Sequence, residues 1–281
     1  MDCAALPLRL KDFCKIYPIL FFMKIRFLLC GIVLLSSLAV SAGERRLQTQ
    51  QQSSDETMRL SADSPAWYAG AGGGIPFGMA TFTSFGSDGI GIGWSAEAFL
   101  GRRFTAVTSA EVSVSAGRVS LSARDCCTER GYWLGSDGIR YNAPVVDKEG
   151  WNYADLRSSV SIFKLDARLN VNILGLVNTL KDSPWTFEVS PSVSVLRAKS
   201  GLSVINSKES AGEDRTGWNF GTGARLQLGC QLGKGIGVSL YSGVTCLFGK
   251  KIDGVPVHQH KTNLLIENGL RLNWTFGGGN D

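Results

Sequence analysis

The chain has 281 residues, 44% of them hydrophobic and 19% charged, which is enough apolar material for one large folded domain. Its 34 glycines and 8 prolines favour a turn-rich all-β protein over a helical one. The net charge of +5 falls to +2, with 24 bases against 22 acids, once residues 1–42 are left out. This balance excludes a large basic surface, and we expect no nucleic-acid partner.

The first predicted element is a targeting segment. Residues 23–26 are positively charged, residues 27–38 are mostly apolar, and residues 40–42 are small. This three-part pattern predicts a secretory signal peptide over residues 23–42. Residues 1–22 are then interpreted as a spurious N-terminal extension from an upstream start codon. An anchor helix over residues 19–38 is an alternative to the signal peptide, but Lys24 and Arg26 interrupt its apolar run.

The remaining chain divides by composition. Residues 43–64 are polar without an apolar period and predict a flexible lead-in. Residues 65–276 form the expected folded domain, and residues 277–281 are a tail.

The segment at residues 163–173, FKLDARLNVNI, carries the clearest pattern. Every odd position is apolar and every even position is polar. A strand points successive side chains to opposite faces, so this period predicts a strand with one apolar and one charged face. Its 11 residues are about the length that a tilted strand needs to cross a bilayer.

The same alternation recurs along the folded domain and predicts eight strands. Gly72 to Gly74 in the first strand would allow close backbone approach or a bend. The strands are expected at residues 67–82, 94–101, 106–116, 163–173, 185–195, 218–232, 236–248 and 264–276.

The connections between these strands alternate in length. Those after the first, third, fifth and seventh strands include the long loops, among them residues 124–157 and 199–216, and the others are shorter. In an up-and-down barrel this places the long loops at one end and the short turns at the other. We therefore expect an all-β fold, an eight-stranded antiparallel up-and-down transmembrane β-barrel.

The aromatic residues favour lipid over water outside this barrel, because indole rings prefer the membrane interface. They fall at predicted strand ends, as two girdles: Trp67, Trp94, Trp185, Trp218, Trp274 and Phe276. The alternative is a secreted, soluble, lipocalin-like barrel that binds an apolar ligand inside.

Charged side chains occupy the opposite faces of the strands, where a shared interior would let them pair. The predicted interior charge network is Glu97, Glu111, Lys164, Asp166, Arg168, Glu188, Arg225, Glu267 and Arg271. These residues could line a water path, as in a small porin-like channel. The interpretation that we favour is a packed network of salt bridges with little conductance.

With these features, the chain resembles the small outer-membrane β-barrel proteins of Gram-negative bacteria, the OmpA/OmpX-like barrels often labelled porin family. The resemblance rests on the signal at residues 23–42, on Trp67-Tyr68-x-Gly-x-x-x-Gly, and on the closing strand that ends at Phe276. It implies location in the cell outer membrane, contact with outer-membrane lipid, and assembly by the barrel-assembly machinery. It implies no particular activity.

Few residues suggest chemistry. Cys126 and Cys127 could form a labile redox pair or a bridge to another chain, or have no role. His258 and His260 could be metal ligands, but a surface loop is the stronger interpretation. Outer-membrane barrel enzymes use Ser, His and acid groups near the rim, and no His-x-Ser pair occurs here. We expect no enzyme, cofactor or metal.

The long loop at residues 124–157 contains the best recognition candidates. Its aromatic residues are interleaved with Asp, Arg and Asn, which is typical of an exposed binding surface. They could instead fold the loop onto itself. They are Tyr132, Trp133, Tyr141, Trp151 and Tyr153. The resulting hypothesis is a non-enzymatic barrel with a role in envelope structure or in surface interaction with an unknown extracellular ligand.

Overall fold

The structure is a computed structural model that describes residues 65–177, 183–207, 209–233, 235–249, 252–256 and 263–276. The predictions on residues 1–64 and 277–281, including the signal peptide, lie outside the described residues. The same is true of His258, His260 and the side chain of Cys126.

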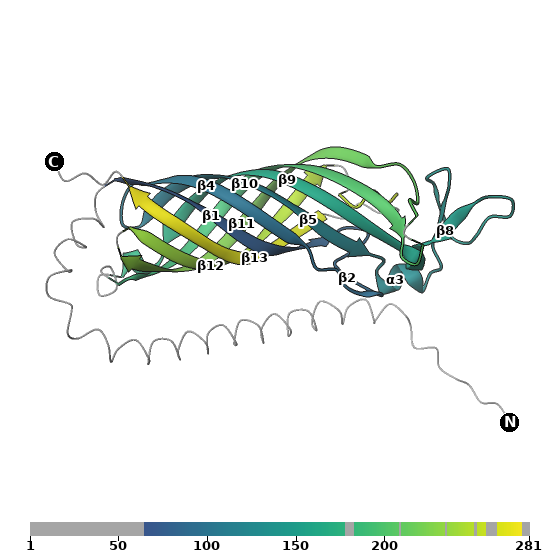
Figure 1. Cartoon of the computed structure of the whole chain (residues 1–281), viewed down its shortest axis with the longest axis horizontal. Helices are drawn as coiled ribbons and strands as arrows, with labels where there is room; N and C mark the ends of the chain where they lie inside the picture. The colour runs from purple at the N-terminus through teal and green to yellow at the C-terminus, as the bar shows by residue number, and fades with distance from the viewer. Residues whose placement is uncertain are drawn as a thin grey trace, which may run out of the picture. The chain divides into compact units, whose positions relative to one another are not determined.

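Eight antiparallel strands close into a barrel in which each strand pairs with the next along the chain and the last pairs with the first (Figure 1). Closure leaves no unpaired strand edge. The predicted eight-stranded up-and-down barrel is therefore confirmed. The barrel strands are β1 (Ala66–Met79), β4 (Trp94–Arg103), β5 (Thr108–Ser122), β9 (Leu156–Asn172), β10 (Trp185–Val204), β11 (Arg215–Gly233), β12 (Ile236–Gly249) and β13 (Asn263–Phe276).

The smaller elements lie in the connections. At the long-loop end these are β2 (Phe85–Gly86), β3 (Gly89–Ile90), α3 (Asp125–Thr128), β6 (Trp133–Gly135), β7 (Arg140–Tyr141), β8 (Gly150–Asn152) and the 3-10 turn η1 (Tyr153–Asp155). The 3-10 turn η2 (Leu174–Leu176) lies at the short-turn end. In the part of the chain that the structure describes, no helix is long and apolar enough to span a membrane.

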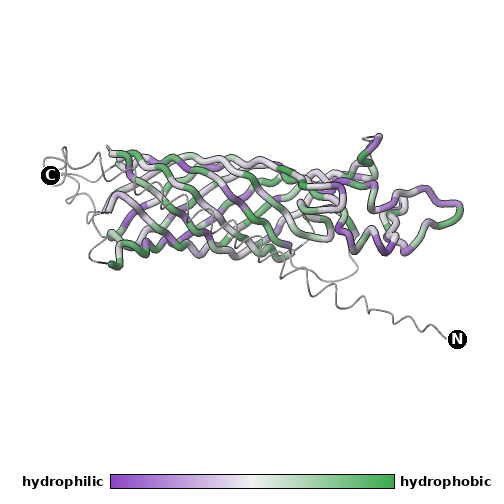
Figure 2. The backbone as a smooth tube through the Cα atoms, turned by 90° about the horizontal axis from the view of Figure 1, so that it is seen from below, coloured by the Kyte–Doolittle hydropathy of each residue, from purple (hydrophilic) through white to green (hydrophobic). Residues whose placement is uncertain are grey.

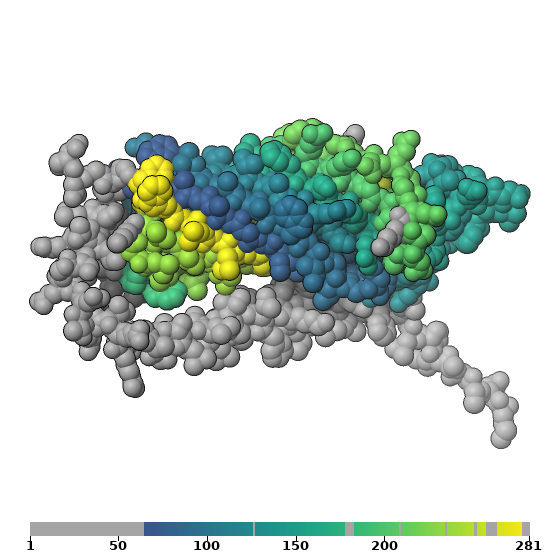
Figure 3. All heavy atoms as spheres, in the orientation of Figure 1, coloured from purple at the N-terminus to yellow at the C-terminus, as the bar shows by residue number. Residues whose placement is uncertain are grey.

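The pairing register sets the tilt of the strands. Starting at Tyr68 and following the paired residues once around the barrel leads to Gly78 on the same strand, a stagger of ten residues. For eight strands this stagger corresponds to a tilt of roughly 40° from the barrel axis. Figure 3 shows β13 (yellow) and β1 (dark blue) crossing the wall obliquely, side by side.

Three strands extend well past their predicted bounds, all toward the long-loop end, whereas β1 ends at Met79, before the predicted end at residue 82. β5 continues past residue 116, β9 begins before residue 163, and β10 continues past residue 195. The polarity of the two faces reverses there: Arg118 and Ser161 point outward, while Val119 is buried. A pattern search for one apolar and one polar face stops at such a reversal, so the strand ends predicted at residues 116, 163 and 195 are wrong. The loop predicted at residues 124–157 agrees closely with the connection between β5 and β9, whereas the loop predicted at residues 199–216 begins too early, because β10 continues to Val204.

The reversed ends of the strands enclose a hydrophobic cluster, the upper core, at the long-loop end of the barrel. Loop residues contribute to it, including Ile252 and Val255 from the connection between β12 and β13. Its buried members are Ala80, Phe82, Val119, Leu121, Ala123, Cys127, Leu134, Tyr153, Leu156, Val160, Ile162, Leu196, Ala198, Leu202, Ala211, Leu247, Ile252, Val255 and Leu265. The interior of the barrel thus changes from charged to apolar along its axis.

Glycines in β1 make room for large interior side chains. A Cβ atom on Gly74 would lie 2.8 Å from the Tyr241 hydroxyl and 2.6 Å from the Asn268 carbonyl oxygen. A Cβ on Gly73, which faces outward, would meet nothing closer than 3.6 Å. The close approach anticipated for Gly72 to Gly74 therefore applies to the inward-facing side of this run.

We expect Gly74→Leu to destabilise the barrel by about 1–3 kcal/mol, because the added side chain overpacks the interior against Tyr241. Heat-modifiable gel mobility and urea unfolding in detergent micelles measure the effect. Gly73→Leu is the matched control and should unfold close to wild type. Equal loss in both variants would contradict the packing argument.

Candidate functional site

The outer wall of the barrel carries an apolar belt between two aromatic groups. At the short-turn end Trp67 pairs with Phe276, and Trp274 pairs with Ile236. At the long-loop end Trp94 is on β4 and Trp218 is on β11. All six predicted girdle residues, including Trp185, have side chains exposed on the outer wall: Trp67, Trp94, Trp185, Trp218, Trp274 and Phe276.

The belt has the height of a bilayer core. Trp67 and Phe77 lie on the outer face of β1, ten residues apart. At 3.3 Å per residue and a tilt of roughly 40°, ten residues span about 25 Å along the barrel axis. Figure 2 shows apolar and polar residues alternating along the strands, as expected when one face meets an apolar surrounding and the other a polar interior.

An arginine accompanies a tryptophan in each girdle. The Arg102 guanidinium lies 5.5 Å from the ring centre of Trp67, and that of Arg197 lies 6.0 Å from Trp218. Cation–π contacts of this kind hold the arginine at the edge of the apolar belt, where its charge can reach water.

Inside the belt, Glu97 is the centre of one half of the charge network. Its carboxylate lies 3.0 Å from an Arg225 nitrogen, 2.9 Å from Arg271 Nε and 3.4 Å from an Arg168 nitrogen. Glu111 bridges Arg168 and Arg271, each at 2.7 Å. These side chains come from β4, β5, β9, β11 and β13, so the network connects opposite walls of the barrel.

The other half of the network is a chain of ion pairs that starts on β9. Arg168 contacts Asp166 at 2.8 Å, and Asp166 contacts Lys164 at 3.1 Å. Lys164 also pairs with Glu267 on β13. Ser194 on β10 donates a hydrogen bond of 2.5 Å to Asp166.

The connected network balances its charge. Among the described residues, its ion pairs join four carboxylates to four cations, and every one of these groups is buried. Aromatic rings cover two of the cations: Arg225 lies 4.0 Å from the Tyr241 ring centre and Arg271 lies 3.5 Å from that of Phe99. Each of these buried charges therefore has a partner of opposite sign within ion-pair distance.

Glu188 lies apart from these ion pairs, although the sequence grouped it with them. Gln227 donates a hydrogen bond of 3.1 Å to its carboxylate, and Arg271 donates one of 2.7 Å to Gln227. Glu188 thus connects to the network through a neutral amide. Glu188 lies nearer the short-turn end of the barrel than the ion pairs do. Sequence alternation predicts that it faces inward, but it does not predict its position along the barrel axis.

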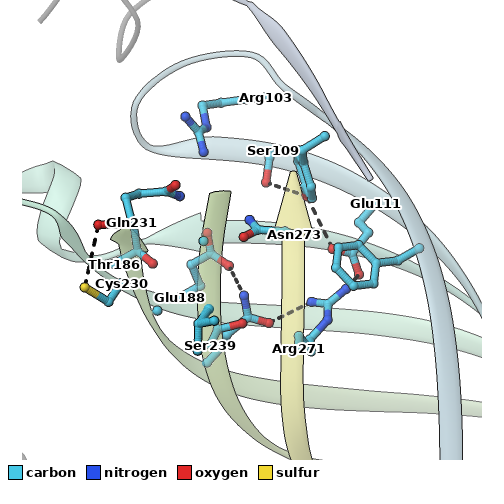
Figure 4. Close-up of a pocket in the computed structure, with 16 residues that line it drawn as sticks. Arg103, Ser109, Glu111, Thr186, Glu188, Cys230, Gln231, Ser239, Arg271 and Asn273 are labelled. Carbon is cyan, nitrogen blue, oxygen red and sulfur yellow. Dashed lines mark hydrogen bonds and ion pairs between the residues drawn. The ribbon is translucent and has the colours of Figure 1, made fainter. Parts of the chain in front are cut away.

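A polar pocket lies between the network and the short-turn end (Figure 4). Glu111 and Arg271 line it together with Arg103, Glu188 and Asn273. Tyr68 at its wall accepts a hydrogen bond of 3.0 Å from Asn170 and donates one of 3.4 Å to Glu111. The network therefore forms the inner end of this pocket.

Residues 252–256, the plug segment, enter the barrel at the opposite end. The Phe82 amide donates a hydrogen bond of 2.9 Å to the Asp253 carboxylate, and the Ser158 hydroxyl donates one of 2.7 Å to the Asp253 carbonyl. The Tyr153 hydroxyl donates one of 3.3 Å to Pro256. The sequence analysis predicts only a loop between the last two strands here. The apolar residues Ile252 and Val255, on either side of Asp253-Gly254, are the sequence feature that could have indicated a buried segment.

The predicted recognition aromatics do not form one exposed surface. Trp133 is 6% exposed and Tyr153 is fully buried in the upper core, with its ring centre 5.5 Å from that of Phe82. The prediction of exposure is wrong for these two residues. Tyr153 packs in the upper core, and Trp133 on β6 packs against Tyr141 on β7, so for Trp133 the alternative holds that the loop folds onto itself. Tyr132, Tyr141 and Trp151 are half-buried.

A polar cluster supports the small sheet β7-β6-β8 in this loop. Lys148 and Tyr141 both donate hydrogen bonds of 2.6 Å to Asp137. These hydrogen bonds lower the pKa of Asp137 to about 2, and the bond from Lys148 has the largest effect. Asp137 is therefore charged at neutral pH, and it joins the two arms of the loop.

The described cysteines lie in the upper core and in the barrel wall. Cys127 is buried in the upper core, whereas Cys230 and Cys246 lie on the β11 and β12 strands of the wall. No cluster of three His, Cys, Asp or Glu side chains suited to a metal occurs among the residues that the structure describes.

No family model matches the chain, and no curated protein sequence matches it. Several solved structures are similar. Neisserial surface protein A is 13% identical with a TM-score of 0.43, and the match covers 75% of this chain and 97% of that one. Ail of Yersinia pestis is 11% identical (TM-score 0.40; 76% and 99% covered), and a major outer membrane protein of Thermus thermophilus is 10% identical (0.44; 75% and 99%). These neighbours are of the kind that the sequence resemblance named.

We expect Glu97→Gln to lower the free energy of unfolding by about 3–5 kcal/mol, because it leaves Arg168, Arg225 and Arg271 with too few buried carboxylates. Urea unfolding in detergent micelles, followed by tryptophan fluorescence, measures the loss.

The double variant Glu97→Gln/Arg225→Gln restores neutrality and should recover part of that loss, with a coupling of about 0.5–3 kcal/mol. Arg157→Gln breaks a surface pair with Asp88 and serves as control, with an expected loss of about 1 kcal/mol or less. Additive effects of the two interior changes would contradict a coupled network.

Proposed function

We propose that the protein is a non-enzymatic outer-membrane barrel that presents its long-loop end to the outside of the cell for surface interaction. The observation that carries this proposal is the polarity of the barrel, which is apolar outside and charged inside. A soluble barrel that holds an apolar ligand requires the reverse arrangement. Outer-membrane lipid is then its surrounding and the barrel-assembly machinery its partner during biogenesis.

A closed interior supports a structural or binding role over transport. The charge network fills the barrel at the level of the belt, and the upper core closes it toward the long-loop end. In small eight-stranded barrels side chains can fill the whole interior. A permeating ion would have to displace paired buried charges and then cross an apolar layer.

The long-loop end is built as a supported platform. β5, β9 and β10 continue beyond the belt, and the small sheet β7-β6-β8 stands on them, near β8 and α3 in Figure 1. Ile139 and Val146 are exposed on this sheet's connections, at 54% and 85%. Exposed apolar side chains on an ordered support are typical of interaction surfaces.

We expect planar-bilayer recordings of the purified protein to show only small or rare openings, because two layers close the barrel. A variant in which residues 252–255 are replaced by a Gly-Ser linker should also stay closed, since the charge network remains. Large steady openings of the wild type would contradict the proposal and favour a porin-like channel. Openings in the linker variant alone would assign the closure to the plug segment.

We expect replacement of residues 136–149 by a Gly-Ser linker to abolish the attachment that wild-type expressing cells show in a screen of immobilised extracellular ligands, because the exposed tip of the small sheet is lost. Replacement of residues 206–210 by a Gly-Ser linker of equal length, which leaves the buried Ala211 in place, is the control and should attach as wild type. Heat-modifiable mobility must be retained in both. Unchanged attachment of the first variant would contradict a recognition role for this loop.

A further inference from the structure

A row of polar residues crosses the outer wall just beyond the apolar belt. Arg118 on β5 pairs with Ser161 on β9, and Ser161 pairs with Lys199 on β10. Two residues nearer the short-turn end, the row is Ala116, Phe163 and Arg197. The polarity of the wall therefore changes within one step along these strands.

The row lies in a groove on the outer surface. The groove is lined mainly by hydroxyls and charged groups: Arg118, Ser159, Ser161, Lys199, Ser203 and Asp214. Arg118 Nε donates a hydrogen bond of 2.6 Å to the Ser159 hydroxyl. This bond fixes the guanidinium over the groove and leaves its terminal nitrogens as donors.

The spacing of the two cations suits a single anion. Arg118 and Lys199 are on either side of β9, so their Cα atoms are separated by two strand spacings, about 10 Å. Both side chains are long enough to reach the middle of that gap, where Ser161 offers a hydroxyl. A fork of guanidinium donors, an ammonium and hydroxyls is the donor set that recognises a phosphate.

We propose that this groove binds the phosphate of an outer-leaflet lipid whose acyl chains lie on the belt below. Phe163 and Leu165 on β9, exposed by 48% and 45%, continue directly from Ser161 toward the middle of the belt. Trp218 and Arg197 border the same region. The inference rests on the proposed membrane location and adds a ligand class to it.

Lys199 already has a partner, Asp214, at 2.9 Å. Both side chains of this pair are more than half exposed, at 59% and 54%, so the pair is held weakly in water. A lipid phosphate at the membrane surface would be present at high local concentration, and it can engage Lys199 together with Arg118. A free phosphate lacks the acyl chains that contact the belt, and salt screens its attraction to exposed cations.

Native mass spectrometry of the barrel released from detergent micelles tests this assignment, with lipid A as the probe. The wild type should retain lipid A and should retain its fully dephosphorylated form far less. Arg118→Gln/Lys199→Gln should lower retention of lipid A by about tenfold or more, because two charge-assisted contacts are lost. The matched control Arg102→Gln/Arg130→Gln removes the same charge at exposed positions outside the groove and should bind as wild type.

Three outcomes would overturn the proposal. They are equal retention of lipid A and its dephosphorylated form, unchanged retention in Arg118→Gln/Lys199→Gln, and displacement of lipid A by an equal concentration of inorganic phosphate. The last would assign the groove to a soluble anion. Heat-modifiable mobility and incorporation into phosphatidylcholine nanodiscs, measured on the same samples, report on the barrel itself. Loss of these in the wild type would refute the membrane location instead.

Discussion

The structure depends on the pairing of buried charge inside a closed wall. Closure satisfies the backbone hydrogen bonds of all eight strands, but it also means that every second side chain points into a narrow interior. Where the outer face is apolar, the charged side chains lie inside, and groups such as Arg168 and Glu97 find their partners among the other buried polar side chains. The network is neutral for this reason. A single uncompensated charge at this depth would cost several kcal/mol, about as much as a whole domain's margin of stability.

Sequence alternation is sufficient for the number of strands, their order and, within the apolar belt, their inward and outward faces. The pattern at residues 163–173 correctly places Lys164, Asp166 and Arg168 inside, because the two-residue period of a strand needs no tertiary information. The pairing register between neighbouring strands cannot be predicted from this alternation. Which carboxylate meets which cation follows from a ten-residue stagger around the barrel, and no local pattern encodes it. Glu188 illustrates the limit, since it shares the inward face but lies at another depth.

The remaining errors have one physical source. A rule that expects apolar outside and polar inside holds only within the membrane-facing belt. Beyond it Arg118 and Lys199 face outward and Val119 and Leu196 face inward, as in a water-soluble protein. The strands therefore seemed to end early. The aromatic pattern of the long loop predicts an exposed Tyr153, although this residue belongs to a hydrophobic core that only the fold assembles from distant segments, including the plug segment.

The reversal of polarity also connects stability to function. The part of the barrel beyond the belt is in effect a small soluble domain, with its own apolar core, built on the same strands as the membrane part. Its core fixes the loops that a surface partner would meet, so the closed interior and the presented platform are one structural feature. A wider or water-filled barrel would lose the inward-facing Val160 and Leu196 contacts that support the loops. Transport and rigid presentation are thus competing uses of this interior, and the buried upper core is the feature on which the proposal of presentation rests.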